Sequence, residues 1–240
     1  MLHFHQYNSE VGIFELSQKY GLHKSTASRI LTVLKNYGFL QQNPRNRKYS
    51  LGPAIAHLGA SLARSFDSNL IRIARPYMEE LRNAAGETTV LELPTPDYTV
   101  LAIVCEGLGP VRIKGVIGDH HPYHTSAGAK SILAFTNQEH REAVLSRGLA
   151  PVTPHSKTNR AHLEKELEDI RRQGFAFDGE ENNLGIQAFG TPVFNHAEEP
   201  VAAVVIAGAA QNVTWERKDQ FVFLIRQVAS RISEQLYFSD

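Results

Sequence analysis

Near the start of the chain, two stretches carry hydrophobic residues at helical spacing on either side of a tight turn. In "GIFELSQKYGL", Phe14 and Leu16 precede a polar turn, and Gly21 stands where a helix would end in a left-handed residue. Gly38 closes the second stretch, "HKSTASRILTVLKNYG". Its apolar positions are Ala27, Ile30, Leu31 and Leu34. The pattern predicts two helices joined by a turn.

The next stretch, "FLQQNPRNRKYSLG", is typical of a strand, a turn and a second strand. Phe39 and Leu40 begin it, "NPRN" has the composition of a turn, and residues 48–51 lead back. Two helices around a turn, followed by a basic hairpin, predict a winged helix-turn-helix domain over residues 1–52.

The remaining residues alternate between strand-like and helix-like patterns. Helical spacing from residue 53 to about residue 81, with candidate breaks at "FDSN" and Pro76, predicts a linker helix over 53–70 and then a second domain over 71–240. Strands are expected at "TTVLEL", "YTVLAIV", "VRIKGVIG", "IQAFGTPVF" and "VAAVVIAG", and helices over 128–135, "EHREAVLS", a segment ending at Gly174 and the C-terminal end. Helices that enclose a mostly antiparallel sheet predict an α+β fold.

Composition excludes several classes of protein. With 42% hydrophobic and 21% charged residues, the 240-residue chain has the composition of a typical globular protein. Its longest apolar runs are shorter than the roughly 20 residues of a membrane span. The first residues lack the basic and then apolar segments of a signal peptide. The single cysteine can form neither an internal disulfide nor a thiolate cluster. We therefore expect a cytoplasmic protein with no membrane partner.

Charge is distributed unevenly along a chain whose formal net charge is zero. Residues 1–52 hold seven cations and two acids, so they carry +5, and the other 188 residues carry −5. This asymmetry indicates a basic binding module joined to an acidic one.

Polar residues on one side of the second predicted helix fit a phosphate backbone better than plain solvent. An α-helix fits the DNA major groove, where its first turns meet base edges and phosphates. Cations of the predicted hairpin would follow the adjacent backbone or minor groove. The candidate DNA-binding residues are Lys24, Ser25, Thr26, Ser28 and Arg29 on the helix and Arg45, Arg47 and Lys48 in the wing. The alternative is that Ser25 caps the helix and the cations form a solvated face.

Four stretches of the sequence resemble one known family. "FELSQKYGLHKSTASRILTVLKNYGFLQQNPRNRKYSLG" is similar to the DNA-binding domain of the IclR (isocitrate lyase regulator) family of bacterial transcription factors. "HTSAGAKSILAF", "IRRQGFAFDGEENNLGIQAFGTPVFN" and "VAAVVIAGAAQNVT" follow in the order and spacing of that family's GAF/PAS-like effector-binding domain. The resemblance implies a regulator, a repressor or an activator, that binds an operator in double-stranded DNA as a homodimer or homotetramer. One departure is that only "MLHFHQYN" stands where the family has the first helix of its DNA-binding core, so that helix is expected to be truncated.

The resemblance also implies an effector pocket between the sheet and two loops. Carried over residue by residue, Ala127 and Gly128 supply closely approaching backbone and Asp178 a polar anchor. The walls would be Ile186 and Ala188 on one side and Val205, Ala207 and Ala209 on the other. Family members that bind small organic acids often have Cys or Ser at the positions of Val205, Ala207 and Ala209. The aliphatic wall therefore favours a less polar or aromatic metabolite, unless these alanines only pack a sheet face.

An enzyme is the competing class of function. The sequence contains no G-x-S-x-G, H-E-x-x-H, P-loop or G-x-G-x-x-G motif. Carboxylates in "DGEENN" and the histidines His120, His121 and His124 are weak candidates for acid–base or metal chemistry. We expect no enzymatic activity, no cofactor and no metal. The alternative within the family is a small-molecule-binding protein with impaired DNA binding.

Overall fold

The computed structural model describes residues 10–55, 68–110 and 112–237. The chain divides into two compact units, Met1–Ser68 and Asn69–Asp240, and each is described by itself. Most of the linker helix predicted over 53–70, and the start of the chain where a truncated first helix was expected, lie outside the described residues. The domain limits at residues 52 and 70 therefore stay predictions.

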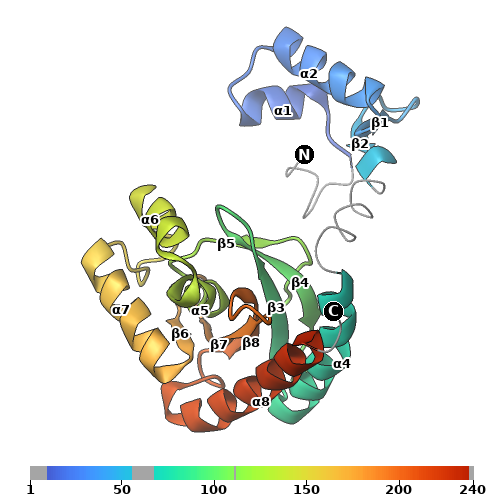
Figure 1. Cartoon of the computed structure of the whole chain (residues 1–240). Coiled ribbons are helices and arrows are strands. Elements are labelled where there is room, and N and C mark those ends of the chain that lie inside the picture. Colours follow the sequence, from blue (N-terminus) through green and yellow to red (C-terminus); the bar gives the residue numbers. More distant parts are fainter. Residues whose placement is uncertain (1–9, 56–67, 111, 238–240) are drawn as a thin grey trace. The chain divides into compact units, whose positions relative to one another are not determined.

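The first unit contains two helices and a two-stranded hairpin (Figure 1). Its elements are α1 (Ile13–Lys19), α2 (Lys24–Asn36), β1 (Leu40–Gln42) and β2 (Tyr49–Leu51). Gly21 and Gly38, with φ of 61° and 74°, end the two helices in the left-handed region that glycine adopts without strain. The strands pair in antiparallel register, Leu40 opposite Leu51. This is the predicted winged helix-turn-helix arrangement.

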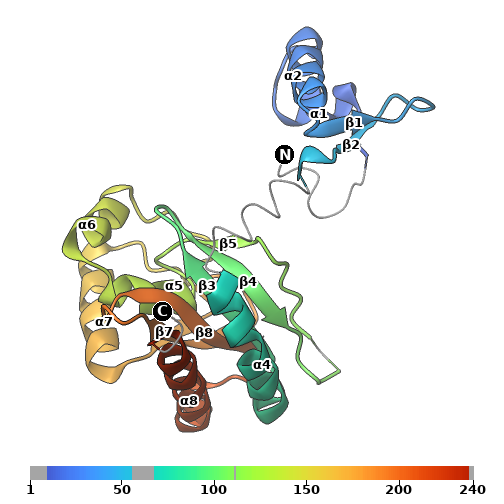
Figure 2. The same ribbon diagram turned by 45° about the vertical axis from the view of Figure 1, so that its right-hand side comes forward.

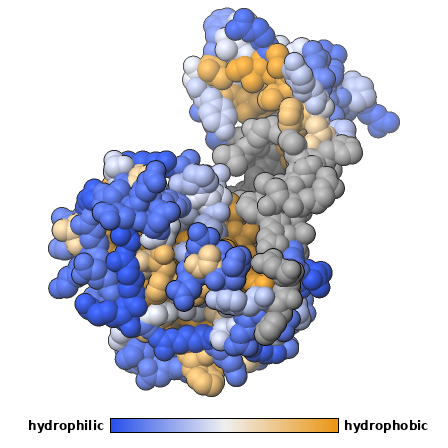
Figure 3. All heavy atoms as spheres, viewed as in Figure 1, coloured by the Kyte–Doolittle hydropathy of each residue, from blue (hydrophilic) through white to orange (hydrophobic). Residues whose placement is uncertain are grey.

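The α2 helix buries a narrower apolar stripe than the sequence predicted. Ala27 and Leu31, one turn apart, are each 3% exposed and face the small core. Ile30 was predicted to lie with them, but it is 45% exposed and shares an outward face with Val33 and Tyr37. Ile30 directly precedes Leu31, so its side chain is turned by about 100° around the helix axis from the buried Leu31. Figure 3 shows hydrophobic atoms exposed on this unit.

The second unit is built on a six-stranded sheet with strand order β5-β4-β3-β8-β7-β6, in which all neighbours are antiparallel. The strands are β3 (Thr88–Pro94), β4 (Thr99–Cys105), β5 (His120–His121), β6 (Ala176–Gly179), β7 (Ile186–Phe194) and β8 (Pro200–Ala209). The helices are α4 (Ser68–Ala85), α5 (Ala127–Phe135), α6 (Gln138–Ser146), α7 (Arg160–Gln173), the 3-10 turn η2 (Trp215–Arg217) and α8 (Lys218–Tyr237). The predicted α+β class is confirmed.

Helices cover the two faces of this sheet unequally. The α5 helix lies against β7, β8 and β3, and α7 lies outside it on the same face. The α8 helix packs on the opposite face, where α4 runs beside it (Figures 1 and 2). Arg231 of α8 joins the two helices, because it pairs with Glu80 at 2.6 Å and lies over the ring of Tyr77.

Two local predictions for the second unit, a strand and a helix break, are wrong. The stretch 111–118 was predicted to be a strand, but residues 112–118 form no strand; Gly118 has φ of 95°, and Val116 and Ile117 are exposed. The outer strand is instead the two-residue β5, which pairs His121 with Thr99. Pro76 does not break α4, since the sheet-facing residues around it hold the helix together. The short strand β6 was not predicted.

No helix in the described part of the chain is long and apolar enough to cross a membrane.

Candidate functional site

The polar face of α2 presents its cations to solvent. Lys24, Ser25 and Arg29 are exposed, and Thr26 and Ser28 are half-buried. The Lys24 ammonium group lies 4.8 Å from the centre of the Phe14 ring of α1, so a cation–π contact holds it at the start of α2. The helix therefore displays two cations within its first six residues, beside the positive end of its dipole.

The N-cap of α2 is His23, which the sequence reasoning missed. Its Nδ1 accepts a hydrogen bond from the backbone N–H of Ser25 at 3.4 Å and lies 2.8 Å from the Ser25 Oγ. Ser25 is thus inside the helix, and the alternative in which it serves only as the cap is wrong. Nothing in the sequence pattern indicated His23, because histidine is not among the usual N-cap residues.

The wing is shaped by hydrogen bonds at its base. Glu10 accepts from the side-chain amides of Asn43 at 2.7 Å and Asn46 at 2.6 Å, which ties the turn to the segment that precedes α1. These contacts lower the pKa of Glu10 and keep it ionised. Glu10 had no distinctive signal in the sequence.

The three wing cations differ in their surroundings. Arg45 and Arg47 are exposed, and Arg47 has φ of 61°, at the bend of the hairpin. Lys48 is paired with Glu15 of α1 at 3.1 Å, so part of its charge is already balanced. Arg45 and Arg47 are therefore the stronger of the three candidates for contact with an external anion.

The predicted effector residues on the strands lie on one face of the sheet. Strand register places Ile186 opposite Ala209, Ala188 opposite Ala207, and Gly190 opposite Val205. Asp178 of β6 stands opposite Ala188. Since alternate residues of a strand point to the same side, these positions share the face that α5 covers. Ala188 and Val205 are buried, and Ile186, Ala207 and Ala209 are partly exposed near the strand ends.

The first turn of α5 approaches this face closely because glycines stand at the contact. A Cβ at position 128 would lie 2.6 Å from the Glu92 Cδ and 2.7 Å from the Val205 Cγ2. A Cβ at position 190 would lie 2.7 Å from the backbone carbon of Ala127. The structure thus brings Gly128 close to Val205 and the backbone of Ala127 close to Gly190, and a ligand at this face stays a prediction.

Asp178 is buried and closes its own loop. One carboxylate oxygen accepts from the backbone N–H groups of Glu181 at 2.7 Å and Asn182 at 3.3 Å. Burial raises the pKa of Asp178 to about 7, although these hydrogen bonds and Lys130 act in the opposite direction. The residue predicted as a ligand anchor is thus also a structural turn residue.

A second buried carboxylate stands on the same face and was missed. Glu92 of β3 is 2% exposed and accepts hydrogen bonds from Thr99 Oγ1 at 2.6 Å and from Ser126 Oγ, the N-cap of α5, at 2.6 Å. Its other neighbour is the His121 imidazole, whose Nδ1 lies 3.3 Å away. An acid at an inward position of the apolar run "TTVLEL" was the available signal.

These contacts keep Glu92 ionised. Burial alone would raise the pKa of Glu92, but His121 and the three hydrogen bonds outweigh it and lower the pKa. Burial alone would likewise lower the pKa of His121, yet Glu92, Asp178 and Asp119 raise it. Each residue thus favours the charged form of the other, with the Glu92 side chain buried and the His121 side chain partly exposed.

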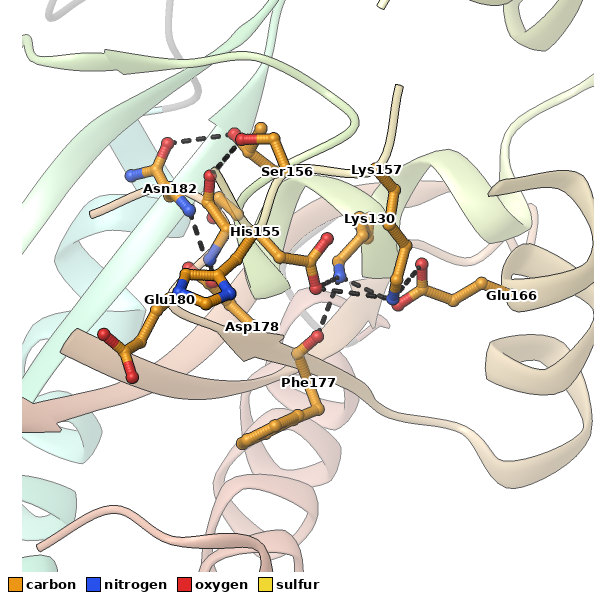
Figure 4. Close-up of polar contacts among 12 residues, drawn as sticks. Lys130, His155, Ser156, Lys157, Glu166, Phe177, Asp178, Glu180 and Asn182 are labelled. Carbon is orange, nitrogen blue, oxygen red and sulfur yellow. Dashed lines mark hydrogen bonds and ion pairs between the residues drawn. The ribbon is translucent and has the colours of Figure 1, made fainter. Parts of the chain in front are cut away.

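A network centred on Lys130 fixes the loop after β6 (Figure 4). Lys130 is fully buried on α5 and donates to Glu166 of α7 at 2.8 Å, to Glu181 at 2.6 Å and to the carbonyl of Phe177 at 2.8 Å. Lys157 also pairs with Glu166 at 2.8 Å. Figure 4 shows both ammonium groups directed toward Glu166. One buried lysine thus joins α5, α7 and the loop that holds Asp178.

The candidate metal ligands have separate partners. His121 pairs with Glu92, His124 Nε2 lies 2.8 Å from the Ala150 carbonyl oxygen, and the His120 ring packs against Tyr98. Within the described ranges, no group of three or more His, Cys, Asp or Glu side chains is arranged to hold a metal ion.

Comparison with protein families matches both units. The family description "Bacterial transcriptional regulator IclR C-terminal" matches residues 65–234, and "IclR helix-turn-helix domain" matches residues 1–44. The transcriptional repressor IclR of Escherichia coli is 30% identical over 231 residues, which cover 94% of this chain and 83% of that protein. The regulator KdgR of Dickeya chrysanthemi is 30% identical over 232 residues, covering 96% and 75%.

Solved structures have the same fold. The crystal structure of the Thermotoga maritima IclR protein superposes with a TM-score of 0.75 at 31% identity, covering 98% of this chain and 95% of that one. An IclR regulator from Alicyclobacillus acidocaldarius gives a TM-score of 0.79 at 26% identity, covering 98% and 94%. With both units matched over most of the chain, this protein belongs to the IclR family of DNA-binding bacterial transcriptional regulators.

Proposed function

We propose that this protein binds an operator through α2 and the β1–β2 wing, and that a small organic metabolite bound on the α5-covered sheet face of the second unit controls that binding. The proposal rests on one observation: the small first unit contains both a helix and a hairpin that expose cations. That unit carries a net charge of +5 over residues 1–52. DNA affinity of such a surface follows from phosphate neutralisation and its specificity from base contacts.

Each candidate residue has a distinct role at the operator. Lys24, Ser25 and Thr26, in the first turn of α2, hold phosphate oxygens together with the helix N-terminus. Ser28 and Arg29 lie one turn further, where an arginine reaches guanine or phosphate. Arg45 and Arg47 follow the neighbouring backbone or minor groove, and Lys48 contributes less because Glu15 shares its charge.

The effector site consists of the first turn of α5, the loop that begins at Asp178, and the aliphatic wall of β7 and β8. The wall supplies hydrocarbon, and hydroxyl groups are absent from the positions of Val205, Ala207 and Ala209. This composition supports a ligand with an apolar body. The lack of enzyme motifs supports a regulator without catalytic activity.

Assembly follows from the geometry of DNA. A helix-turn-helix dimer reads half-sites about one turn apart, roughly 34–36 Å, and a single module makes few contacts. We infer at least a homodimer, with a homotetramer as the larger form, and a cytoplasmic location where operators are accessible.

The test is a gel-shift titration with the DNA upstream of the protein's own gene. Arg29→Ala is expected to weaken specific binding by roughly 1–3 kcal/mol if the side chain reads a base. Arg172→Ala is the matched control, because Arg172 is an exposed arginine of α7 in the other unit. A role at phosphate alone would instead weaken binding to all sequences alike and flatten the salt dependence.

The outcomes separate the alternatives. If the wild type shifts neither this DNA nor any genomic fragment at low salt but still binds a metabolite, the protein is a small-molecule-binding relative without DNA binding. Equal affinities of Arg29→Ala and the wild type at moderate salt would remove Arg29 from the interface.

A further inference from the structure

The effector face already contains an anion of its own. The Glu92 carboxylate and Val205 both lie beside Gly128, because a Cβ at position 128 would lie 2.8 Å from Glu92 Oε1 and 2.7 Å from Val205 Cγ2. Glu92 therefore stands among the residues assigned to the ligand, and it is 2% exposed.

This carboxylate lies at the positive end of α5. Its Oε1 accepts the hydroxyl of Ser126, which is the N-cap of the nine-residue helix, at 2.6 Å. The N-terminus of a helix carries a partial positive charge and favours a nearby anion. Here a side chain of the protein supplies that anion, so the helix terminus is already balanced before any ligand arrives.

Cations near this face are also balanced by carboxylates. His121 faces Glu92 at 3.3 Å and is further influenced by Asp178 and Asp119. Lys130, on α5, is bound between Glu166 and Glu181. Lys157 pairs with the same two carboxylates at 2.8 and 3.4 Å. Among the described residues around this site, His121, Lys130 and Lys157 are thus each already paired with a carboxylate of the protein. A ligand carboxylate would find none of these three cations unpaired.

We propose that the effector is a neutral molecule that donates hydrogen bonds, and that Glu92 is the residue that rejects carboxylates. This inference rests on the proposed effector site and names its ligand class. Hydroxyl or amide N–H groups of the ligand would donate to the Glu92 and Asp178 carboxyl groups, and its apolar body would lie against Val205, Ala188 and Ala207. A ligand carboxylate would have to lose its water beside the ionised, buried Glu92, and the repulsion between two negative charges in a buried site is strong.

The experiment compares small acids with their primary amides, which have nearly the same shape. Isothermal titration at pH 7.5 uses the full chain and a panel from lactate and lactamide to 4-hydroxybenzoate and 4-hydroxybenzamide. For the compounds that bind, we expect the amide to bind about tenfold more tightly than its acid, or better. Glu92→Gln retains groups that can hydrogen-bond to Thr99 and Ser126 but removes the charge, so the preference should fall to about threefold or less.

Two further variants make the result decisive. His121→Gln leaves the Glu92 charge without its partner and should strengthen the preference for amides. Glu139→Gln, at an exposed position on α6, is the matched control and should leave it unchanged. Melting curves establish whether each variant is folded. If Glu92→Gln does not fold, the comparison of His121→Gln with the wild type tests the inference.

The outcomes are distinguishable from those for DNA binding. Acids that bind as well as or better than their amides, a preference unchanged in a folded Glu92→Gln, or no binding by any compound of the panel would overturn the inference. In the first two cases, release of the DNA by whichever compound binds would leave the regulatory function intact. Amide preference without any gel shift would support the ligand class and refute the DNA-binding proposal.

Discussion

Replacing Lys130 by methionine should destabilise the second unit more than any exposed lysine substitution. The side chain is fully buried and donates to Glu181 at 2.6 Å and to Glu166 at 2.8 Å. Methionine fills most of the volume but leaves these carboxylates with fewer partners. Removing one member of a buried ion pair costs about 3–5 kcal/mol. Lys157 remains 2.8 Å from Glu166, so we expect the lower limit, about 3 kcal/mol.

The assay is urea and thermal unfolding of the full chain, followed by circular dichroism. A loss of about 3 kcal/mol corresponds to a fall in melting temperature of about 6–12 °C for a unit of this size. Lys165→Met, at an exposed position of α7, is the matched control and should change the free energy of unfolding by less than about 0.5 kcal/mol. Adding Glu181→Gln to Lys130→Met should recover about 1 kcal/mol, because it removes a buried charge that has lost Lys130 and keeps only Lys157, at 3.4 Å.

The pH dependence gives the deciding result. Burial alone would raise the pKa of Glu166, but Lys130 and Lys157 lower it below its usual range. A carboxylate with a lowered pKa stabilises the fold above its unfolded pKa of about 4.3, and this contribution is lost as the pH falls through the folded value. The difference between wild type and Lys130→Met should therefore shrink in acid. A Lys130→Met protein as stable as the wild type at pH 7, or an equal difference at pH 3, would refute the network as a source of stability.

Three other measurements test the remaining assignments. Burial raises the pKa of Asp178 to about 7, so the folded state loses stability as the pH rises from the unfolded pKa of about 3.9 toward 7. Asp178→Asn should therefore raise the melting temperature at pH 8 but leave it unchanged at pH 3, and equal effects at both pH values would contradict this assignment. Val205→Asp should abolish ligand-induced thermal stabilisation if the variant folds, because it places an unpaired charge in the wall; normal binding would exclude Val205 from the site. Light scattering at micromolar concentration should give a dimer or tetramer, and a clean monomer would contradict the assembly.

Local patterns predicted the elements that are amphipathic and bounded by glycine. The α1 and α2 helices end near Gly21 and Gly38, and α7 ends at Gly174, whose φ of 73° is left-handed. Strands β7 and β8, Ile186–Phe194 and Pro200–Ala209, have lengths close to those expected. In each case the signal lies within about a dozen neighbouring residues, so no distant contact was needed.

Predictions failed where distant segments override the local pattern. The apolar run at 111–118 has strand-like composition, but the edge of the sheet is completed by His120 and His121, because β4 pairs there. Ile30 belongs to an apolar face of α2 by composition and remains exposed. Pro76 stays inside α4, since Met78 and Leu81, at 0% and 1% exposure, anchor the helix to the unit.

Sequence by itself determined the family, the class of fold and the charge difference between the two units, because these depend on residue types and their order along the chain. Only the tertiary structure decided which polar groups meet. Glu92, His121 and Ser126 are as far as 34 positions apart in the chain, and Lys130 and Glu181 are 51 apart. Their charges matter through distance in space and through burial, which raises the cost of an unpaired charge and the strength of a paired one. Both properties are set by the packing of α5 on the sheet.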